Sequence, residues 1–218
     1  MQVLSTNNCA VVGVILAGGL GRRLGGGDKA LRLLAGQPLV AHVVARLAPQ
    51  LAPGRLLLNA NGVGPELTSF GLPLLADTRP GRPGPLAGIL AAMQAIRSEA
   101  GEDGWVLSAP TDTPFLPLDL VARLAEQQSS AAADIVLAGS AAGLCQVCGL
   151  WSCRLADALA QSLAIGQNKV LAFASAHKMS QVTFPPQPVG GEKVDPFFNI
   201  NTADDLAAAE RLLSHESQ

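Results

Sequence analysis

The sequence predicts an α/β protein with a doubly wound, mostly parallel sheet and helices on both faces. Short apolar runs that suit buried strands alternate with amphipathic segments that suit helices. The length of 218 residues fits one domain of this class and is short for two. Hydrophobic residues make up 49% and charged residues 15%, which supplies a core and argues against disorder outside flexible ends at residues 1–10 and 214–218.

Six apolar runs predict the strands. In the first, three valines and one isoleucine fall within six residues broken only by Gly13, which is typical of a parallel strand covered on both faces. The predicted strands are Val11–Leu16, Arg55–Asn59, Leu72–Ala76, Trp105–Ala109, Ile135–Ala138 and Leu144–Trp151.

Apolar residues at helical spacing predict the helices. The clearest stripe runs from Leu86 to Ile96 with apolar residues at i, i+3, i+4, i+7 and i+10. Thr202-Ala-Asp-Asp205 resembles a capping box, with Asp in place of Glu, before a last helix at Leu206–Leu213. Further helices are expected from Pro38 through Leu47, from Pro117 to about Gln127, and over Leu155–Leu163.

Bulk properties exclude several classes of partner. The formal charge is −2 and no basic run is present, which argues against nucleic acid. No apolar run is long enough for a membrane span, and Met1–Ala10 has no signal-peptide pattern. We therefore expect a cytoplasmic protein, a monomer or weak oligomer, whose four cysteines (Cys9, Cys145, Cys148 and Cys153) are free thiols.

The loop Leu16–Lys29 carries six glycines and three cations, Arg22, Arg23 and Lys29. Glycines let successive backbone N–H groups approach a polyphosphate, and the cations can bind its oxygens. Three positive charges oppose the roughly four negative charges of a nucleoside triphosphate, so one divalent metal would supply most of the remaining balance. The loop therefore predicts a nucleoside triphosphate site that uses Mg²⁺.

Two other phosphate-binding loops fit poorly. In a Walker A loop the lysine follows glycine and precedes Ser or Thr, whereas Asp28 precedes Lys29 and Ala30 follows it. A dinucleotide loop needs Gly-x-Gly-x-x-Gly and an acid at the end of the next strand, which here ends in Asn59.

Polar residues at or past predicted strand ends form the candidate site. Lys29, Asn59, Asp77 and Asp112 are expected to converge on one edge of the sheet, where doubly wound folds bind ligands. Asp112 is the candidate Mg²⁺ ligand, although alone it also suits a turn or helix cap, as Asn59 suits a strand-end cap. Gly84 and Gly88 would let the start of the helix near Leu86 approach phosphate.

Five segments taken in order resemble the bacterial molybdenum cofactor guanylyltransferases, over roughly Val12 to Leu212. These segments are Leu16–Lys29, Leu57–Asn61, Pro83–Gly88, Pro110–Phe115 and Asp195–Thr202. The resemblance implies a three-layer, Rossmann-like nucleotidyltransferase fold and the transfer of GMP from GTP to the phosphate of molybdopterin, with release of pyrophosphate. It also implies molybdenum-insertion and molybdoenzyme chaperone proteins as candidate partners.

Carried onto this chain, the resemblance implies the following site. GTP would contact Leu16, Ala17, Gly18, Gly19, Lys29, Asn59, Asp77 and Asp112, with Mg²⁺ on Asp112. Gly84, Asn199 and Asn201 are the candidate substrate contacts. On chemical grounds we expect Arg22, Arg23 and Lys29 to hold the β- and γ-phosphates and stabilise the leaving pyrophosphate, together with that metal. Members of the family usually have a proline after His or Gln before Gly-Leu-Trp, whereas Gln146 is followed here by Val147 and Cys148.

Other functions remain open at this point. A cytidylyl or sugar-1-phosphate transferase shares the first loop, and a non-catalytic nucleotide-binding module could keep it without a metal site. A dinucleotide-dependent oxidoreductase is disfavoured by the loop spacing. Cys145 and Cys148 form a weak metal or redox motif, because no nearby His or second pair completes four ligands and residues three apart on a strand face opposite sides.

Overall fold

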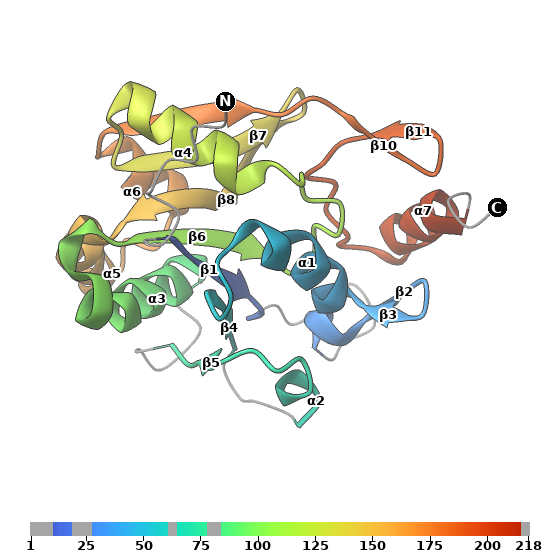
Figure 1. The fold of residues 1–218 in the computed structure, drawn as a ribbon, viewed down its shortest axis with the longest axis horizontal. Helices are drawn as coiled ribbons and strands as arrows, with labels where there is room; N and C mark the ends of the chain where they lie inside the picture. The colour runs from blue at the N-terminus through green and yellow to red at the C-terminus, as the bar shows by residue number, and fades with distance from the viewer. Residues whose placement is uncertain (1–10, 19–27, 61–64, 78–83, 215–218) are drawn as a thin grey trace.

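A seven-stranded sheet forms the centre of the computed structural model, which describes residues 11–18, 28–60, 65–77 and 84–214 (Figure 1). The strand order is β5-β4-β1-β6-β8-β7-β9. Its strands are β1 (Val11–Leu16), β4 (Leu56–Asn59), β5 (Leu74–Leu75), β6 (Trp105–Pro110), β7 (Ile135–Ser140), β8 (Gly143–Ser152) and β9 (Met179–Thr183). Of these seven described strands only β8 is antiparallel to its neighbours, so the predicted mostly parallel α/β sheet is confirmed.

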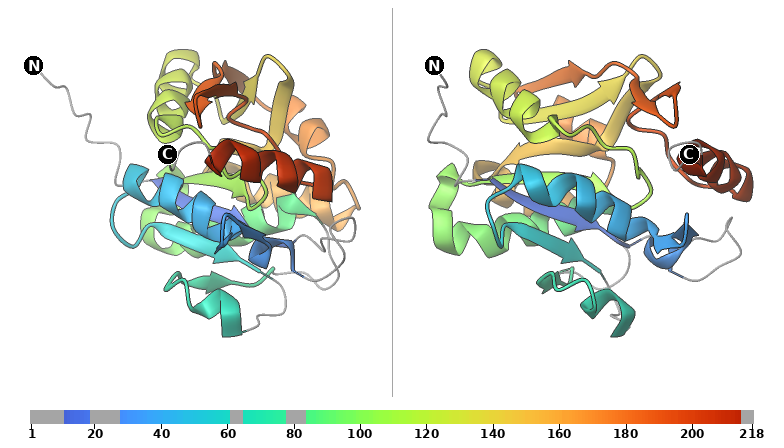
Figure 2. Two further views of the ribbon diagram at one scale, coloured as in Figure 1. Left: turned by 90° about the vertical axis from the view of Figure 1, so that its right-hand side faces the viewer. Right: turned by 45° about the vertical axis from the view of Figure 1, so that its right-hand side comes forward.

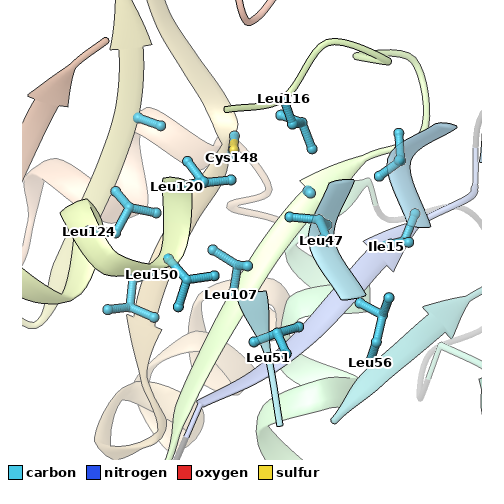
Figure 3. Packing of buried hydrophobic residues seen from close by; sticks show 14 of the residues in the cluster. Ile15, Leu47, Leu51, Leu56, Leu107, Leu116, Leu120, Leu124, Cys148 and Leu150 are labelled. Carbon is cyan, nitrogen blue, oxygen red and sulfur yellow. The ribbon is translucent and has the colours of Figure 1, made fainter. Parts of the chain in front are cut away.

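Helices cover both faces of the sheet and make three layers (Figure 1). One apolar cluster joins the sheet to α1 (Leu39–Leu47) and α4 (Leu120–Ala131), and Figure 3 shows Ile15 and several leucines of this cluster. A second cluster joins the other face to α3 (Pro85–Ala100), α5 (Ala156–Ala164) and α6 (Val170–Ser175). Alternate β1 residues enter the two clusters, Ile15 the first and Val14 the second, as expected for a strand buried on both faces.

A third, smaller cluster lies at the end of the molecule where the candidate site falls. It joins three elements besides α1, which Figure 2 shows at the same end of the sheet. They are the hairpin of β2 (Leu33–Leu34) and β3 (Gln37–Pro38), the hairpin of β10 (Gln187–Val189) and β11 (Glu192–Val194), and α7 (Ala203–Ser214). The buried side chains of Leu34, Phe115 and Ile200 connect them. This cluster therefore places the C-terminal segment against the loop that follows β6.

A buried polar contact ties β6 to β8. The Ser108 hydroxyl donates to the carbonyl of Val147 at 2.8 Å and accepts a hydrogen bond from Trp151 Nε1 at 2.8 Å. Ser108 and Trp151 are both fully buried, so each polar atom depends on this arrangement for its partner.

Several elements differ from the sequence-based expectation. β5 has two residues instead of the expected Leu72–Ala76. Helix α7 extends to Ser214, one residue into the expected flexible C-terminal end, and residues 1–10 and 215–218 lie outside the described residues. The hairpins, α2 (Pro65–Thr68), α6 and β9 were not predicted, because their short or polar sequences carry little periodicity. None of the described helices is long and apolar enough to cross a membrane.

Candidate nucleotide site

Three parallel strands end side by side at the candidate site. Leu16, the last residue of β1, pairs with Asn59 of β4 on one side and with Pro110 of β6 on the other. Asp112 follows β6 by two residues, and the backbone N–H of Ala17 donates to Asn59 O at 2.8 Å. The strand-end residues predicted from the sequence therefore share one edge of the sheet.

Lys29 and Asp112 form a largely buried ion pair at this edge. Lys29 Nζ lies 2.5 Å from Asp112 Oδ2 and also donates to Asn201 Oδ1 at 2.6 Å. The two charged side chains are only 10% and 16% exposed. A short 3₁₀ turn holds Lys29 in place, and Asp28 caps that turn by accepting from the N–H of Ala30 at 3.0 Å.

The second carboxylate oxygen of Asp112 has a different environment. Asp112 Oδ1 is buried and has no hydrogen-bond partner among the described residues. A carboxylate oxygen without a partner is costly to bury, so it marks a position where a ligand or cation would be stabilising.

The C-terminal segment is fixed to the same place by its backbone. The N–H of Ile200 donates to the carbonyl of Asp112 at 2.9 Å. Asp205 Oδ2 accepts from the N–H groups of Asn201 at 2.9 Å and Thr202 at 2.8 Å, and Thr202 Oγ1 accepts from the N–H of Asp205 at 3.1 Å. The predicted capping box is therefore present, and it also positions the residue that binds Lys29.

The electrostatics of this cap follow from those contacts. The hydrogen bond from the backbone of Asn201 holds the pKa of the Asp205 carboxyl below its usual value, and bonds from Thr202 and the charge of Lys29 act in the same direction. Sequence reasoning assigned Asp205 only to helix capping. Its link to the site depends on the fold and has no local sequence signal beyond the capping box.

A second polar pair lies on the other side of β1. Asn59 is 5% exposed, and its Nδ2 donates to Asp77 Oδ1 at 2.9 Å and to the carbonyl of Leu75 at 3.1 Å. A Cβ at Gly88 would lie 2.3 Å from Asn59 Oδ1 and 2.7 Å from Leu16 Cδ2. Gly88 therefore lets α3 pack directly against Asn59, a role distinct from the phosphate approach expected from the sequence.

The remaining predicted residues are placed unevenly. Gly84 is an exposed N-cap of α3 with φ of 85°, a conformation that favours glycine, and Gly18 is exposed. Asn199 is exposed, and the lysine contact belongs to Asn201, two residues further along. Gly19, Arg22 and Arg23 lie outside the described residues.

One protein carboxylate is enough for the metal that the sequence predicts. Across the described residues there is no group of three or more His, Cys, Asp or Glu side chains able to hold a metal ion. Mg²⁺ is usually held by one or two carboxylates, substrate phosphates and water, so Asp112 with its unpartnered Oδ1 fits that ion when nucleotide is bound.

The fold and the residues at this edge place the protein in the class of α/β nucleotide-binding proteins. Its sequence has a glycine-rich first loop, and a Lys–Asp pair lies at the strand ends. Residues 13–181 match the model of the MobA-like NTP transferase domain, and the chain belongs to this family. The predicted family is thereby confirmed.

Close relatives extend the similarity over nearly the whole chain. A protein from Bradyrhizobium sp., named molybdenum cofactor guanylyltransferase, is 45% identical over 98% of this chain and 98% of its own. One of the same name from Rhodopseudomonas palustris is 46% identical over 96% and 97%. The crystal structure of molybdopterin-guanine dinucleotide biosynthesis protein A from Archaeoglobus fulgidus has the same fold, with a TM-score of 0.73 at 24% identity over 93% of this chain and 98% of that one.

Proposed function

We propose that this protein transfers GMP from GTP to the phosphate of molybdopterin and releases pyrophosphate, which gives the guanine dinucleotide form of the cofactor. The near full-length identity of about 45% to proteins named molybdenum cofactor guanylyltransferase supports the reaction. The contact of Lys29 with Asp112 and Asn201 at the strand ends is the structural observation that carries it.

Nucleotidyl transfer requires positioning of the reacting phosphates and neutralisation of their charge. The attacking phosphate is already ionised, so no strong general base is needed, and catalysis depends on alignment and stabilisation of developing charge. Lys29 is held rigidly by two acceptors and presents a fixed positive charge to the leaving pyrophosphate. We expect Arg22 and Arg23 to add charge from the glycine-rich loop.

Asp112 has two tasks in this proposal. Its Oδ2 orients Lys29, while its Oδ1 remains available to hold Mg²⁺ with the triphosphate. When bound, Mg²⁺ would neutralise phosphate charge and polarise the phosphate that is attacked. Asn59 and Asp77 are hydrogen-bonded on the other side of β1, where we expect base or ribose to be recognised.

Binding of the pterin substrate near Asn199 and Gly84 is also part of the proposal. We expect Asn199, which is exposed, to contact the pterin substrate directly, with Gly84 at the start of α3 contacting substrate as well. Asn201 would act through Lys29. The cytoplasmic location, the monomeric or weakly oligomeric state and the chaperone partners stay predictions.

Product formation in a defined mixture tests the function. The protein would be incubated with molybdopterin, Mg²⁺ and either GTP or CTP, and dinucleotide and pyrophosphate would be quantified by chromatography and an enzyme-coupled assay. We expect equal amounts of both products with GTP and little with CTP. A preference for CTP would replace the guanylyl assignment with a cytidylyl one, and no product with either nucleotide would refute transfer.

A matched pair of variants tests the site. Asp112→Asn should lower turnover by about 10²–10³-fold, the usual cost of one well-placed electrostatic contact. Asp119→Asn is the control, because Asp119 is exposed at the start of α4 and makes no side-chain capping bond. Wild-type turnover for Asp112→Asn at saturating Mg²⁺ would refute the role of Asp112.

A further inference from the structure

The Cys145-Gln-Val-Cys148 segment of β8 does not follow the regular alternation of a strand. Leu137 pairs with Gly149, and Gly139 pairs with Leu144. Between these two pairs lie one residue of β7 and four residues of β8. The three additional residues of β8 form a large bulge between these two pairs. The expectation that residues three apart face opposite sides is therefore wrong for this cysteine pair.

The bulge brings both thiols to one side of the sheet. Cys145 packs against the apolar cluster that contains Cys148, which Figure 3 shows among the leucines of α4 and the sheet. Both thiols therefore lie on the same face of the sheet, and Cys145 is the neighbour that acts most strongly on the Cys148 thiol. Cys148 is fully buried, whereas Cys145 is half-buried, so a solute can reach only the first thiol of the pair.

The buried thiol is unreactive by itself. The interaction with the neighbouring Cys145 thiol, reinforced by burial, raises the pKa of the Cys148 thiol well above its usual range. Thiolates and not thiols are the nucleophiles of disulfide exchange, so the buried Cys148 is the less reactive thiol of the pair toward an oxidant in solution. Attack must begin at Cys145.

A metal is a poor occupant for this pair. The described residues provide no third His, Cys, Asp or Glu beside the two thiols, and a structural zinc site needs four ligands. Cys153 is buried in the cluster on the opposite face of the sheet, so it cannot join them. The pair therefore stands as two neighbouring thiols on one face of the sheet, with one accessible member.

We propose that Cys145 and Cys148 are a reversible modification site that a low-molecular-weight disulfide oxidises to an intramolecular disulfide. The Cys145 thiolate attacks one sulfur of the oxidant, the S–S bond of the oxidant breaks, and one small thiol leaves. Cys148 then loses its proton to solvent and attacks the Cys145 sulfur, which expels the second small thiolate to take up a proton. Two protein thiols are oxidised to one disulfide while the oxidant is reduced to two thiols.

Peptide mass spectrometry after treatment with oxidised glutathione tests the proposal. The folded protein would carry Cys9→Ser and Cys153→Ser so that the remaining thiols belong to the pair. We expect a product lighter by two hydrogen atoms with the bond mapped to Cys145 and Cys148, and full reversal by dithiothreitol. Accumulation of glutathione on Cys145 without an internal bond would overturn the proposal.

Single variants in the same background separate the two thiols. In Cys148→Ser we expect one stable glutathione adduct on Cys145, because no second thiol can displace it. In Cys145→Ser we expect Cys148 to stay a free thiol over the same time, and its rapid modification would contradict the assigned order. Circular dichroism of each variant would confirm that the fold is retained.

Phenylarsine oxide gives an independent measure of how close the two thiols lie. A trivalent arsenical bonds to two sulfurs only when they lie close together, so the reduced parent should retain one arsenical after washing and each single variant should retain none. Failure of the folded parent to retain it would overturn the proposal. None of these measurements depends on transferase activity, so the proposed function and this inference can fail separately.

Discussion

Replacing one member of the Lys29–Asp112 pair should cost both stability and activity, whereas replacing both should cost activity alone. Breaking a buried ion pair by removing one partner typically costs about 3–5 kcal/mol. The two side chains keep 10% and 16% exposure, and Asn201 still accepts from Lys29, so we expect about 2–4 kcal/mol here. For a chain of this length that lowers Tm by about 5–15 °C.

The experiment compares Lys29→Met, Asp112→Asn and the double variant with the parent. Urea denaturation and thermal melting give the free energy of unfolding and Tm, and GTP-dependent pyrophosphate release gives turnover. The double variant removes both charges, so its stability should return to within about 1 kcal/mol of the parent while turnover stays at least about 10²-fold down. Additive destabilisation in the double variant would show that the two charges do not interact, and restored turnover would refute their catalytic role.

Gly88→Ala should destabilise the fold by up to about 2 kcal/mol, because overpacking against Asn59 and Leu16 costs about 1–3 kcal/mol and the higher helix propensity of Ala returns about 1 kcal/mol. Since the clash would displace Asn59, calorimetry should also show up to about tenfold weaker GTP binding. An equal loss in an Asn59→Ala background would rule out a clash with Asn59. Asp205→Ala should cost about 1 kcal/mol in urea denaturation at neutral pH. Because the pKa of Asp205 is lowered in the folded chain, the stability difference between parent and variant should be fully present above about pH 4 and should vanish as the pH falls through the folded pKa. A stability difference that does not change with pH would contradict this role of Asp205. Ser108→Ala should cost about 1–3 kcal/mol in the same assay, since Trp151 Nε1 loses its acceptor, and an unchanged unfolding midpoint would mean that the indole finds another.

The central sheet was predictable because buried strands and helices require recognisable patterns of apolar residues in the sequence. A strand covered on both faces, such as β1, must be apolar throughout, and a helix such as α3 must carry an apolar stripe. Elements held mainly by their neighbours carry no such pattern. β9 lies at the sheet edge and has two adjacent polar residues, Ser180 and Gln181, that break the alternation of a half-buried strand. The hairpin of β10 and β11 is only three residues long on each side.

The candidate site was predictable to the extent that topology dictates it. Parallel strands deliver their ends to one edge, so Asn59 and Asp112 could be located from strand boundaries alone. The contact of Lys29 with Asn201 joins residues 172 positions apart, and no local pattern encodes it. The bulge at Cys145 likewise has no local sequence signal, because the register of β8 against β7 depends on pairing across the sheet.

The distance in sequence between Lys29 and Asn201 has a consequence for the order of assembly. During translation the strands, the glycine-rich loop and every described helix except α7 emerge before Asn201 does. A nascent chain can therefore build most of the sheet while Lys29 still lacks one of its acceptors. Catalytic competence would therefore arrive late, when the third apolar cluster docks the final helix. Until that step the cell holds a folded sheet that is not yet a working catalyst.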